Sequence, residues 1–130
     1  MTDDRTKLQI ELYQKALGRL HEVAAMDETD VVRDALIQRF EFTYEMAWKS
    51  AWRWLRGKGE NLSDKAYEVL PSAFQARLIA DPELWEKIRD YRNLTSHTYK
   101  EALAIEVAAF VRATALPAFD ALLAELKSRA

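Results

Sequence analysis

One short stretch of the sequence, residues 91–99, concentrates side chains that could do chemistry. It reads YRNLTSHTY and holds one of the two histidines in the chain. Histidine exchanges a proton near neutral pH, and arginine binds phosphate oxygens and stabilises added negative charge. Arg92 and His97 together therefore suit cleavage of a phosphodiester. RNA supplies its own nucleophile, the 2′-hydroxyl, so such cleavage requires no metal in principle.

The spacing within this stretch limits how these groups can meet. Arg92 and His97 are five residues apart, about 140° around an ideal helix, so a continued helix does not aim them at one point. They can converge if the helix ends between them, or if two copies of the chain meet across a symmetric interface. Asn93 lies one turn before His97 and can hydrogen-bond to it. Spacing alone favours a structural role, in which His97 caps helix carbonyls and Arg92 makes an ion pair.

The length, the cysteine and histidine counts and the net charge of the chain limit the kinds of site that it can hold. With 130 residues the chain is most simply one domain, residues 1–130. It has no cysteine, which excludes disulfides and cysteine-based zinc sites, and its two histidines are far apart in sequence. We therefore expect neither a metal nor a cofactor. A net charge of -2 gives no global attraction to nucleic acid, so RNA binding would need a local basic patch.

Hydropathy predicts a cytoplasmic protein that does not contact a membrane. The N-terminal residues lack the apolar core of a signal peptide. No continuous apolar run approaches the roughly 20 residues needed to span a bilayer.

Apolar residues recur at helical spacing through most of the chain, and turn residues are scarce, with three glycines and three prolines. This pattern predicts an all-α fold. Asp81 and Pro82 have the types expected of a helix cap and a first helical residue, so a helix begins there and carries the 91–99 stretch. The other expected helices are 4–26, 31–56, 63–79 and 100–127. Four long helices and a shorter connector predict a four-helix bundle.

Two prolines fall inside these predicted helices. Proline removes a backbone donor and clashes with the preceding turn. We expect Pro71 to kink the 63–79 element or divide it into two short helices near Leu70. Pro117 is expected to kink the last helix after Ala113.

The 31–56 helix is apolar around nearly its whole circumference, which is typical of a helix surrounded by protein. It is either the central helix of the bundle, or it packs on the core with one face and on another chain with the other. Glu41 and Glu45 interrupt its apolar surface. They lie either on a solvated edge of the helix or beside Arg92, since a buried charge needs a partner.

Aromatic and basic residues alternate at the end of this helix: Trp48, Lys49, Trp52, Arg53, Trp54, Arg56 and Lys58. Such a pattern can bind single-stranded nucleic acid by charge and stacking. Cations in a last turn also stabilise the helix dipole, which is the more ordinary explanation. The second histidine, His21, is expected at a surface or half-buried position of the first helix.

Two motifs together resemble a known family. The stretch 92–99 fits the R-x-x-x-x-H-x-Y pattern of HEPN-superfamily proteins. Together with QRFEFTYEMAWK at residues 38–49, it resembles the nucleotidyltransferase substrate-binding protein family within that superfamily. The resemblance covers nearly the whole chain. Pro71 and the tryptophan-rich end of the 31–56 helix depart from the family pattern, but neither touches the motif.

The resemblance implies an antiparallel four-helix bundle that forms a homodimer, with a separate nucleotidyltransferase of the MNT type as partner. Related pairs are toxin–antitoxin modules, in which the helical protein is a metal-independent ribonuclease and the nucleotidyltransferase silences it by AMPylation. Carried over, Arg92 and His97 would be catalytic, and Tyr99 would be the modified residue. The expected supporting residues are Asn93, Ser96, Glu41 and Glu45.

Two other interpretations stay open. The family's older name implies a non-catalytic subunit that presents a substrate to the nucleotidyltransferase. Alternatively, the bundle serves only assembly, in which case Arg92 and His97 are separated and individually satisfied.

Overall fold

Six α-helices account for most of residues 2–130, the part of the chain that this computed structural model describes. They are α1 (Asp4–Ala24), α2 (Asp30–Gly57), α3 (Ala66–Gln75), α4 (Pro82–Leu94), α5 (Glu101–Phe110) and α6 (Leu116–Ser128). A 3₁₀ turn, Thr95–His97, follows α4, and a π-helical turn, Val111–Ala115, joins α5 to α6.

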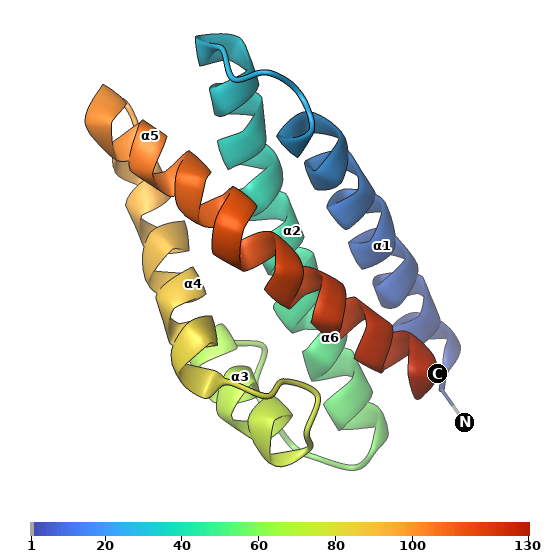
Figure 1. Cartoon of the computed structure of the whole chain (residues 1–130). Helices are drawn as coiled ribbons and strands as arrows, with labels where there is room; N and C mark the ends of the chain where they lie inside the picture. Colours follow the sequence, from blue (N-terminus) through green and yellow to red (C-terminus); the bar gives the residue numbers. More distant parts are fainter. Residues whose placement is uncertain (1) are drawn as a thin grey trace.

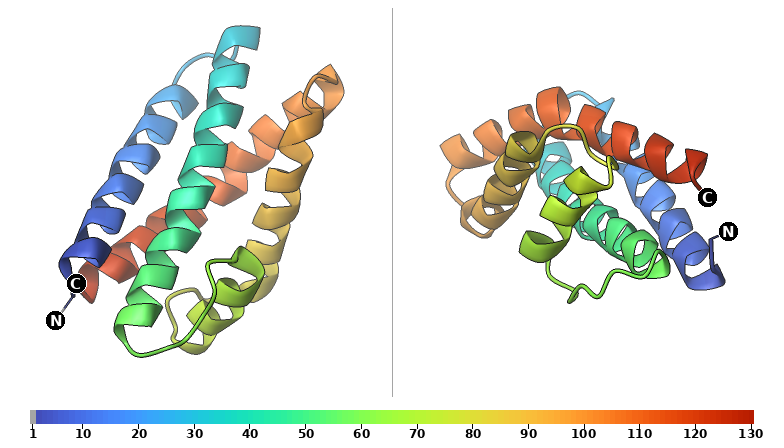
Figure 2. Two further views of the ribbon diagram at one scale, coloured as in Figure 1. Left: turned by 180° about the vertical axis from the view of Figure 1, so that it is seen from behind. Right: turned by 90° about the horizontal axis from the view of Figure 1, so that it is seen from below.

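The long helices run up and down to form a bundle, as expected. In Figure 1, α1, α2, α4 and the continuous α5–α6 unit alternate in direction, and α3 connects α2 to α4 at one end. The views in Figure 2 show α1 and α2 side by side, with the α5–α6 unit crossing them at an angle. Both termini lie at the same end. The prediction of an all-α, antiparallel four-helix bundle with a short helical connector is confirmed.

Three of the helices begin at residues that satisfy free backbone N–H groups. The side chains of Asp3, Thr29 and Asp81 each accept a hydrogen bond from the N–H three residues further on, at 2.7, 3.1 and 3.2 Å. Pro82 is the first residue of α4, where its missing N–H costs nothing. After α2 the chain turns at Gly59, whose φ of 96° favours glycine.

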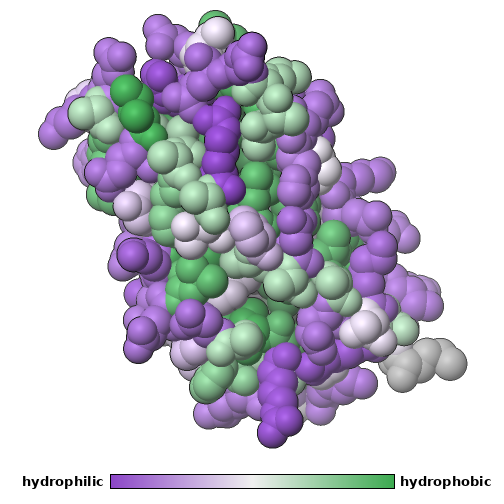
Figure 3. All heavy atoms as spheres, viewed as in Figure 1, coloured by the Kyte–Doolittle hydropathy of each residue, from purple (hydrophilic) through white to green (hydrophobic). Residues whose placement is uncertain are grey.

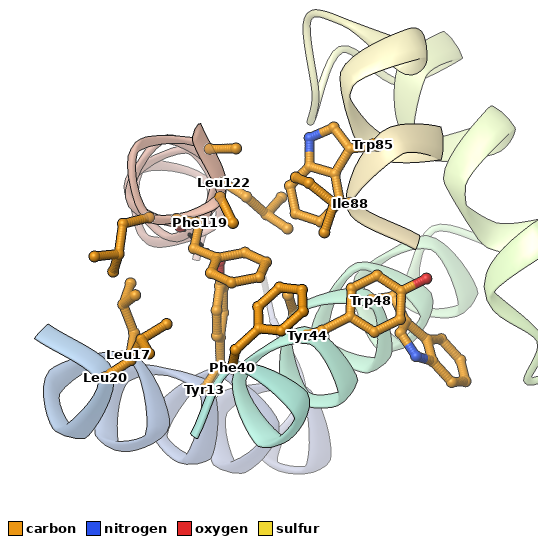
Figure 4. Close-up of a cluster of buried hydrophobic side chains, with 14 of the residues drawn as sticks. Tyr13, Leu17, Leu20, Phe40, Tyr44, Trp48, Trp85, Ile88, Phe119 and Leu122 are labelled. Carbon is orange, nitrogen blue, oxygen red and sulfur yellow. Dashed lines mark hydrogen bonds between the residues drawn. The ribbon is translucent and has the colours of Figure 1, made fainter. Parts of the chain in front are cut away.

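The core forms where α1, α2, α4 and α6 meet (Figure 4). Phe119 of α6 is fully buried and packs against Phe40 and Trp85, with ring centroids 6.0 and 5.8 Å away. The buried hydroxyl of Tyr13 donates a hydrogen bond to the backbone carbonyl of Phe119 at 2.5 Å, which ties α1 to α6. Helix α2 packs against all five other helices, so its central position accounts for its apolar circumference.

The structure differs from the prediction at Pro71 and agrees with it at Pro117. Helix α3 is one short helix with Pro71 inside it, rather than the expected longer element divided near Leu70. It begins at Ala66, so Pro71 removes only one hydrogen bond, to the carbonyl of exposed Tyr67. Pro117 disturbs the last helix where expected, because the wider π-helical turn ends just before it and leaves room for its ring.

The sequence predicted no apolar stretch long enough to span a bilayer, and the segment from α5 through α6 differs from this prediction. An 18-residue window within residues 101–128 is long and apolar enough by composition to span a membrane, with a mean hydropathy of 1.6, yet half of that window is buried in the bundle. Much of the exposed side of this segment is alanine, at positions 102, 109, 113, 121 and 124. Figure 3 shows this face, where apolar and hydrophilic side chains are interspersed. Its hydropathy therefore reflects core packing and small exposed residues.

We predict that Phe119→Ala destabilises the bundle by about 3–5 kcal/mol, because it leaves a cavity at the contact of four helices. Urea unfolding measured at one protein concentration checks this value. Phe74→Ala is the matched control, since Phe74 is 44% exposed, and should cost less than about 1 kcal/mol. Equal losses in the two variants would contradict this account of the core.

Candidate functional site

The motif stretch lies where α4 gives way to the 3₁₀ turn. Three hydroxyl side chains there donate to backbone carbonyls three residues earlier: Thr95 to Arg92 at 2.6 Å, Ser96 to Asn93 at 3.2 Å and Thr98 to Thr95 at 2.9 Å. Such bonds compete with regular helix hydrogen bonds. The run of hydroxyl residues therefore ends the helix between Arg92 and His97, one of the two conditions under which these residues could converge.

Arg92 lies between the two glutamates of α2. One terminal nitrogen is 3.5 Å from Glu41 Oε2, and Nε is 3.8 Å from Glu45 Oε1. Both distances are too long for strong hydrogen bonds. The guanidinium donates instead to the hydroxyl of Thr95 at 3.1 Å. Within residues 2–130, Arg92 Nε is buried and has no hydrogen-bond partner. Charge thus holds this arginine in place while leaving hydrogen-bond donors unused.

Glu45 serves two groups. Its other oxygen accepts a hydrogen bond from the indole nitrogen of Trp48 at 3.2 Å, one turn further along α2. This bond limits the rotamers that Glu45 can adopt. It therefore helps to fix the carboxylate that faces Arg92, so both glutamates named as supporting residues lie beside the arginine.

His97 and Tyr99 lie apart from Arg92 in this chain. Both are exposed, and Tyr99 is 78% exposed. Their rings meet edge to face with centroids 6.3 Å apart, and Lys100 Nζ lies 6.0 Å from the Tyr99 ring. In the described part of the chain, no hydrogen bond or ion pair joins Arg92 to His97. A single chain therefore presents the two residues as neighbours in sequence, not as one closed site.

Tyr91 anchors the motif helix to α5. Its ring stacks on Phe110 with centroids 3.9 Å apart and planes 6° apart, and its hydroxyl donates to Glu106 at 3.0 Å. Burial, followed by the hydrogen bond to Glu106, raises the pKa of Tyr91, so the hydroxyl stays protonated. These contacts position the end of α4.

Two cavities touch Arg92, and His97 lines neither. One, of about 240 Å³, is formed by Gln38, Glu41, Phe42, Glu45 and Arg92. The other, which we call the Tyr44 pocket, has a volume of about 250 Å³ and lies between α2, α3 and α4. Its main lining residues are Tyr44, Trp48, Tyr67, Arg89, Arg92 and Asn93.

Tyr44 is a residue that sequence analysis missed. It is 3% exposed, and its hydroxyl has no hydrogen-bond partner within residues 2–130. Figure 4 shows the hydroxyl pointing away from the Phe40–Phe119 contact. Burial, and then the Glu45 carboxylate, raise the pKa of Tyr44 well above its ordinary value. A buried tyrosine hydroxyl usually finds a partner, and its position one turn before Trp48 was the signal available in the sequence.

The basic end of α2 is engaged within the chain. The guanidinium of Arg53 lies 4.8 Å from the Trp52 ring, while Lys58 and Arg129 each lie 5.2 Å from the Trp54 ring. These cation–π contacts stabilise the junction of α2 with the C-terminus. Arg53 and Lys58 thus contact rings of their own chain, and binding of single-stranded nucleic acid at this end of α2 stays a prediction.

The second histidine, His21, lies on α1 beside Asp120 of α6. His21 is exposed and pairs with Asp120 Oδ1 at 2.7 Å. Within residues 2–130, no group of three or more histidine, aspartate or glutamate side chains is placed to hold a metal ion.

Comparison with known proteins identifies a family whose model matches most of this chain. A family model described as "Nucleotidyltransferase substrate binding protein like" matches residues 8–128. A Haemophilus influenzae protein named "Probable ribonuclease HepT" is 39% identical over 88 residues, or 62% of this chain and 60% of that protein. The match therefore spans less than two thirds of that relative.

Two solved structures share the fold over nearly their full length. A crystal structure from Thermus thermophilus is 36% identical, with a TM-score of 0.71, and the match covers 90% of this chain and 97% of the other. A Haemophilus influenzae structure is 30% identical, with a TM-score of 0.79 and coverage of 91% and 98%. It is described as revealing the fold of a substrate binding domain of a nucleotidyltransferase.

We predict that Arg92→Gln changes the free energy of unfolding by less than about 1 kcal/mol, because its ion pairs are long and partly exposed. Arg112→Gln is the matched comparison. Arg112 is similarly exposed but hydrogen-bonds directly to Glu28 and to the carbonyl of Ala24, so its loss should cost about 1–3 kcal/mol. Urea unfolding measures both. A larger loss for Arg92→Gln than for Arg112→Gln would indicate that Arg92 serves stability.

Proposed function

This chain belongs to the nucleotidyltransferase substrate-binding protein family, and we propose that it is a HEPN-type ribonuclease that a separate MNT-type nucleotidyltransferase controls. In this proposal the pair forms a toxin–antitoxin module in the cytoplasm, and this chain is the toxin. The observation that carries the proposal is Arg92, a cation fixed between Glu41 and Glu45 that keeps hydrogen-bond donors unused.

The proposed reaction is metal-independent cleavage of RNA. His97 accepts the proton of a 2′-hydroxyl, and the 2′-oxygen forms a bond to the adjacent phosphorus. The bond from phosphorus to the 5′-oxygen breaks, and that oxygen takes a proton, through water, from the protonated His97. One fragment then ends in a 5′-hydroxyl and the other in a 2′,3′-cyclic phosphate. Arg92 binds the phosphate oxygens and stabilises their added negative charge in the transition state. Glu41 and Glu45 hold Arg92 in position, while Asn93 and Ser96 support the end of α4.

A second copy of the chain would complete this site. Within one chain, Arg92 and His97 do not meet. A groove of about 530 Å³ between α1 and α2 carries apolar residues and ends at Phe42, which is 61% exposed and also lines the cavity beside Arg92. Leu8 and Leu12 on α1 are exposed as well, at 58% and 43%. Apolar exposure of this kind, next to the site, supports a homodimer through this face.

Charges on either side of Phe42 favour one orientation of the dimer. Lys15, Arg19 and Arg39 line the groove on the α1 side. Glu41 and Glu45 lie on the α4 side. A twofold axis parallel to α2 places the basic edge of each copy opposite the acidic edge of the other, whereas a perpendicular axis opposes like charges. An isologous interface requires such self-complementarity.

Tyr99 is well placed for control by a partner enzyme. It lies beyond the end of α4 and is 78% exposed. An AMP group on its hydroxyl would add bulk and negative charge two residues from His97. Negative charge there would repel the phosphates of RNA. The proposal therefore makes AMPylation of Tyr99 the means by which the nucleotidyltransferase silences this chain.

A non-catalytic substrate-binding subunit is the second candidate function. The separation of Arg92 and His97 within one chain favours it, as does the description of the similar Haemophilus influenzae structure. In that role the chain would present a substrate to the nucleotidyltransferase. The complex would then form unchanged in His97→Ala, and the chain alone would not cut RNA.

We predict that the chain expressed without its partner slows growth and cuts total cellular RNA. Arg92→Gln and His97→Ala should each lower cleavage by at least about 100-fold. When the two variants are co-expressed, about a quarter of wild-type cleavage should return, because half the dimers are mixed and each mixed dimer keeps one intact site. Electrophoresis of the RNA measures the effect.

The same experiment separates a shared site from a site within one chain. Recovery requires that Arg92 and His97 come from different copies, so no recovery argues against a composite site.

Phe42→Asp should yield monomers in light scattering and no cleavage. Val31→Asp, at an exposed position outside the groove, should stay dimeric. A wild-type chain that neither cuts RNA nor slows growth would leave the substrate-binding subunit as the better interpretation.

We predict that co-expression with a minimal nucleotidyltransferase encoded beside this chain adds the mass of AMP to Tyr99 and abolishes RNA cleavage. Intact-protein and peptide mass spectrometry measure the addition. Tyr99→Phe should block it, whereas Tyr67→Phe should not, although Tyr67 is also exposed at 60%. Modification of Tyr99→Phe to the wild-type extent would refute the assignment.

A further inference from the structure

The Tyr44 pocket contains two buried groups whose hydrogen-bonding capacity is unused. Tyr44 lines it at 3% exposure, and its hydroxyl has no partner within residues 2–130. Arg92 lines the same pocket, and its Nε is also buried without a partner in that part of the chain. Leaving a buried donor unpaired costs free energy. Two such donors in one pocket are therefore suited to a ligand with acceptor atoms.

Aromatic rings form the side of this pocket nearest α3. Trp48 contributes from α2, and its indole nitrogen is fixed by Glu45 at 3.2 Å. Tyr67 contributes from α3 and is 60% exposed, with Lys65 Nζ at 6.0 Å from its ring. An exposed ring beside a cation is a surface on which a planar aromatic group stacks. This wall therefore favours a ligand that contains a flat ring.

The α4 side of the pocket supplies charge and an amide. Arg89 and Arg92 lie one turn apart and both line it, against one carboxylate, that of Glu45. Asn93 adds a side chain that can both donate and accept. Cations bind a phosphate, and an amide reads the polar edge of a base. The volume of about 250 Å³ lies just below the range of about 300–1,000 Å³ that is usual for small-molecule sites, which limits the ligand to one nucleotide.

We propose that the Tyr44 pocket binds one nucleotide next to Arg92, with the base stacked on Tyr67 and the Tyr44 hydroxyl and Arg92 Nε donating to its acceptor atoms. This inference rests on the proposed function, because it takes the ligand of the Arg92 site to be nucleic acid. The nucleotide is either a residue of the RNA substrate beside the cut or a free mononucleotide. Both present the same base and phosphate to the pocket.

The test measures binding of two probes to the full-length chain. One probe is AMP, whose binding is measured by calorimetry. The other probe is a fluorescein-labelled 2′-O-methyl RNA octamer, whose binding is measured by fluorescence anisotropy. This octamer cannot be cut, because it has no free 2′-hydroxyl. Tyr67→Ala should weaken binding by about 5- to 100-fold through loss of stacking. Tyr44→Phe, which removes only the hydroxyl, should weaken it by about 3- to 10-fold.

Two variants control for indirect effects. Phe74→Ala removes a partly exposed ring of α3 that does not line the pocket. Ser128→Ala removes a hydroxyl at the end of α6 that donates to the carbonyl of Glu125. Both should bind the probes as the wild type does. Thermal unfolding checks that every variant is folded.

The two probes distinguish RNA from a free nucleotide as the ligand of the Tyr44 pocket. Binding of the octamer but not AMP assigns the pocket to RNA, and binding of AMP but not the octamer assigns it to a free nucleotide. Binding of both supports a nucleotide pocket that accepts either source. The inference fails if the wild type binds neither probe at about 1 mM, or if Tyr44→Phe and Tyr67→Ala bind like the wild type. Because no probe is cut, a chain without ribonuclease activity can still pass this test, and an active ribonuclease can fail it.

Discussion

The burial of α2 is the constraint from which the positions of the other helices follow. This helix is apolar around most of its circumference, so most of its sides must be covered. It packs against α1, α3, α4, α5 and α6, and the fully buried Phe40 meets Phe119 at its centre. The crossing α5–α6 unit and the short α3 connector are the elements that close the two sides left by the α1–α2 pair (Figure 2).

The same helix sets up the candidate site, because one turn of α2 faces two environments. Glu41 and Glu45 face Arg92 on α4, while Phe42 between them remains exposed at the α1–α2 groove. A charged cluster and an apolar contact surface are therefore joined through a single helical turn. Any molecule that covers Phe42 also borders the cavity next to Arg92. In the proposed function, assembly and chemistry are consequently linked by geometry.

Periodicity and capping residues were enough to predict the bundle, because both depend on neighbours in sequence. Asp81 and Pro82 mark the start of α4 for this reason. The sequence left open whether Glu45 meets Arg92, since spacing gives a direction around a helix but not the helix that lies opposite. The Tyr44 pocket could not be predicted at all, because it depends on the relative placement of α2, α3 and α4.

Arg92 contacts its carboxylates differently from Arg112 and Arg129. Arg129 donates to Glu125 and to the carbonyls of Ala76 and Arg77 at 2.8–2.9 Å, and so closes the chain end over α3. Arg92 has comparable side-chain exposure, 29% against 24%, but faces its carboxylates at 3.5 and 3.8 Å. Arg112 also keeps one buried nitrogen without a partner within residues 2–130, but it bonds directly to Glu28 and to the carbonyl of Ala24. What distinguishes Arg92 from Arg112 and Arg129 is therefore the lack of a direct hydrogen bond to a carboxylate, which leaves its guanidinium able to bind a further acceptor.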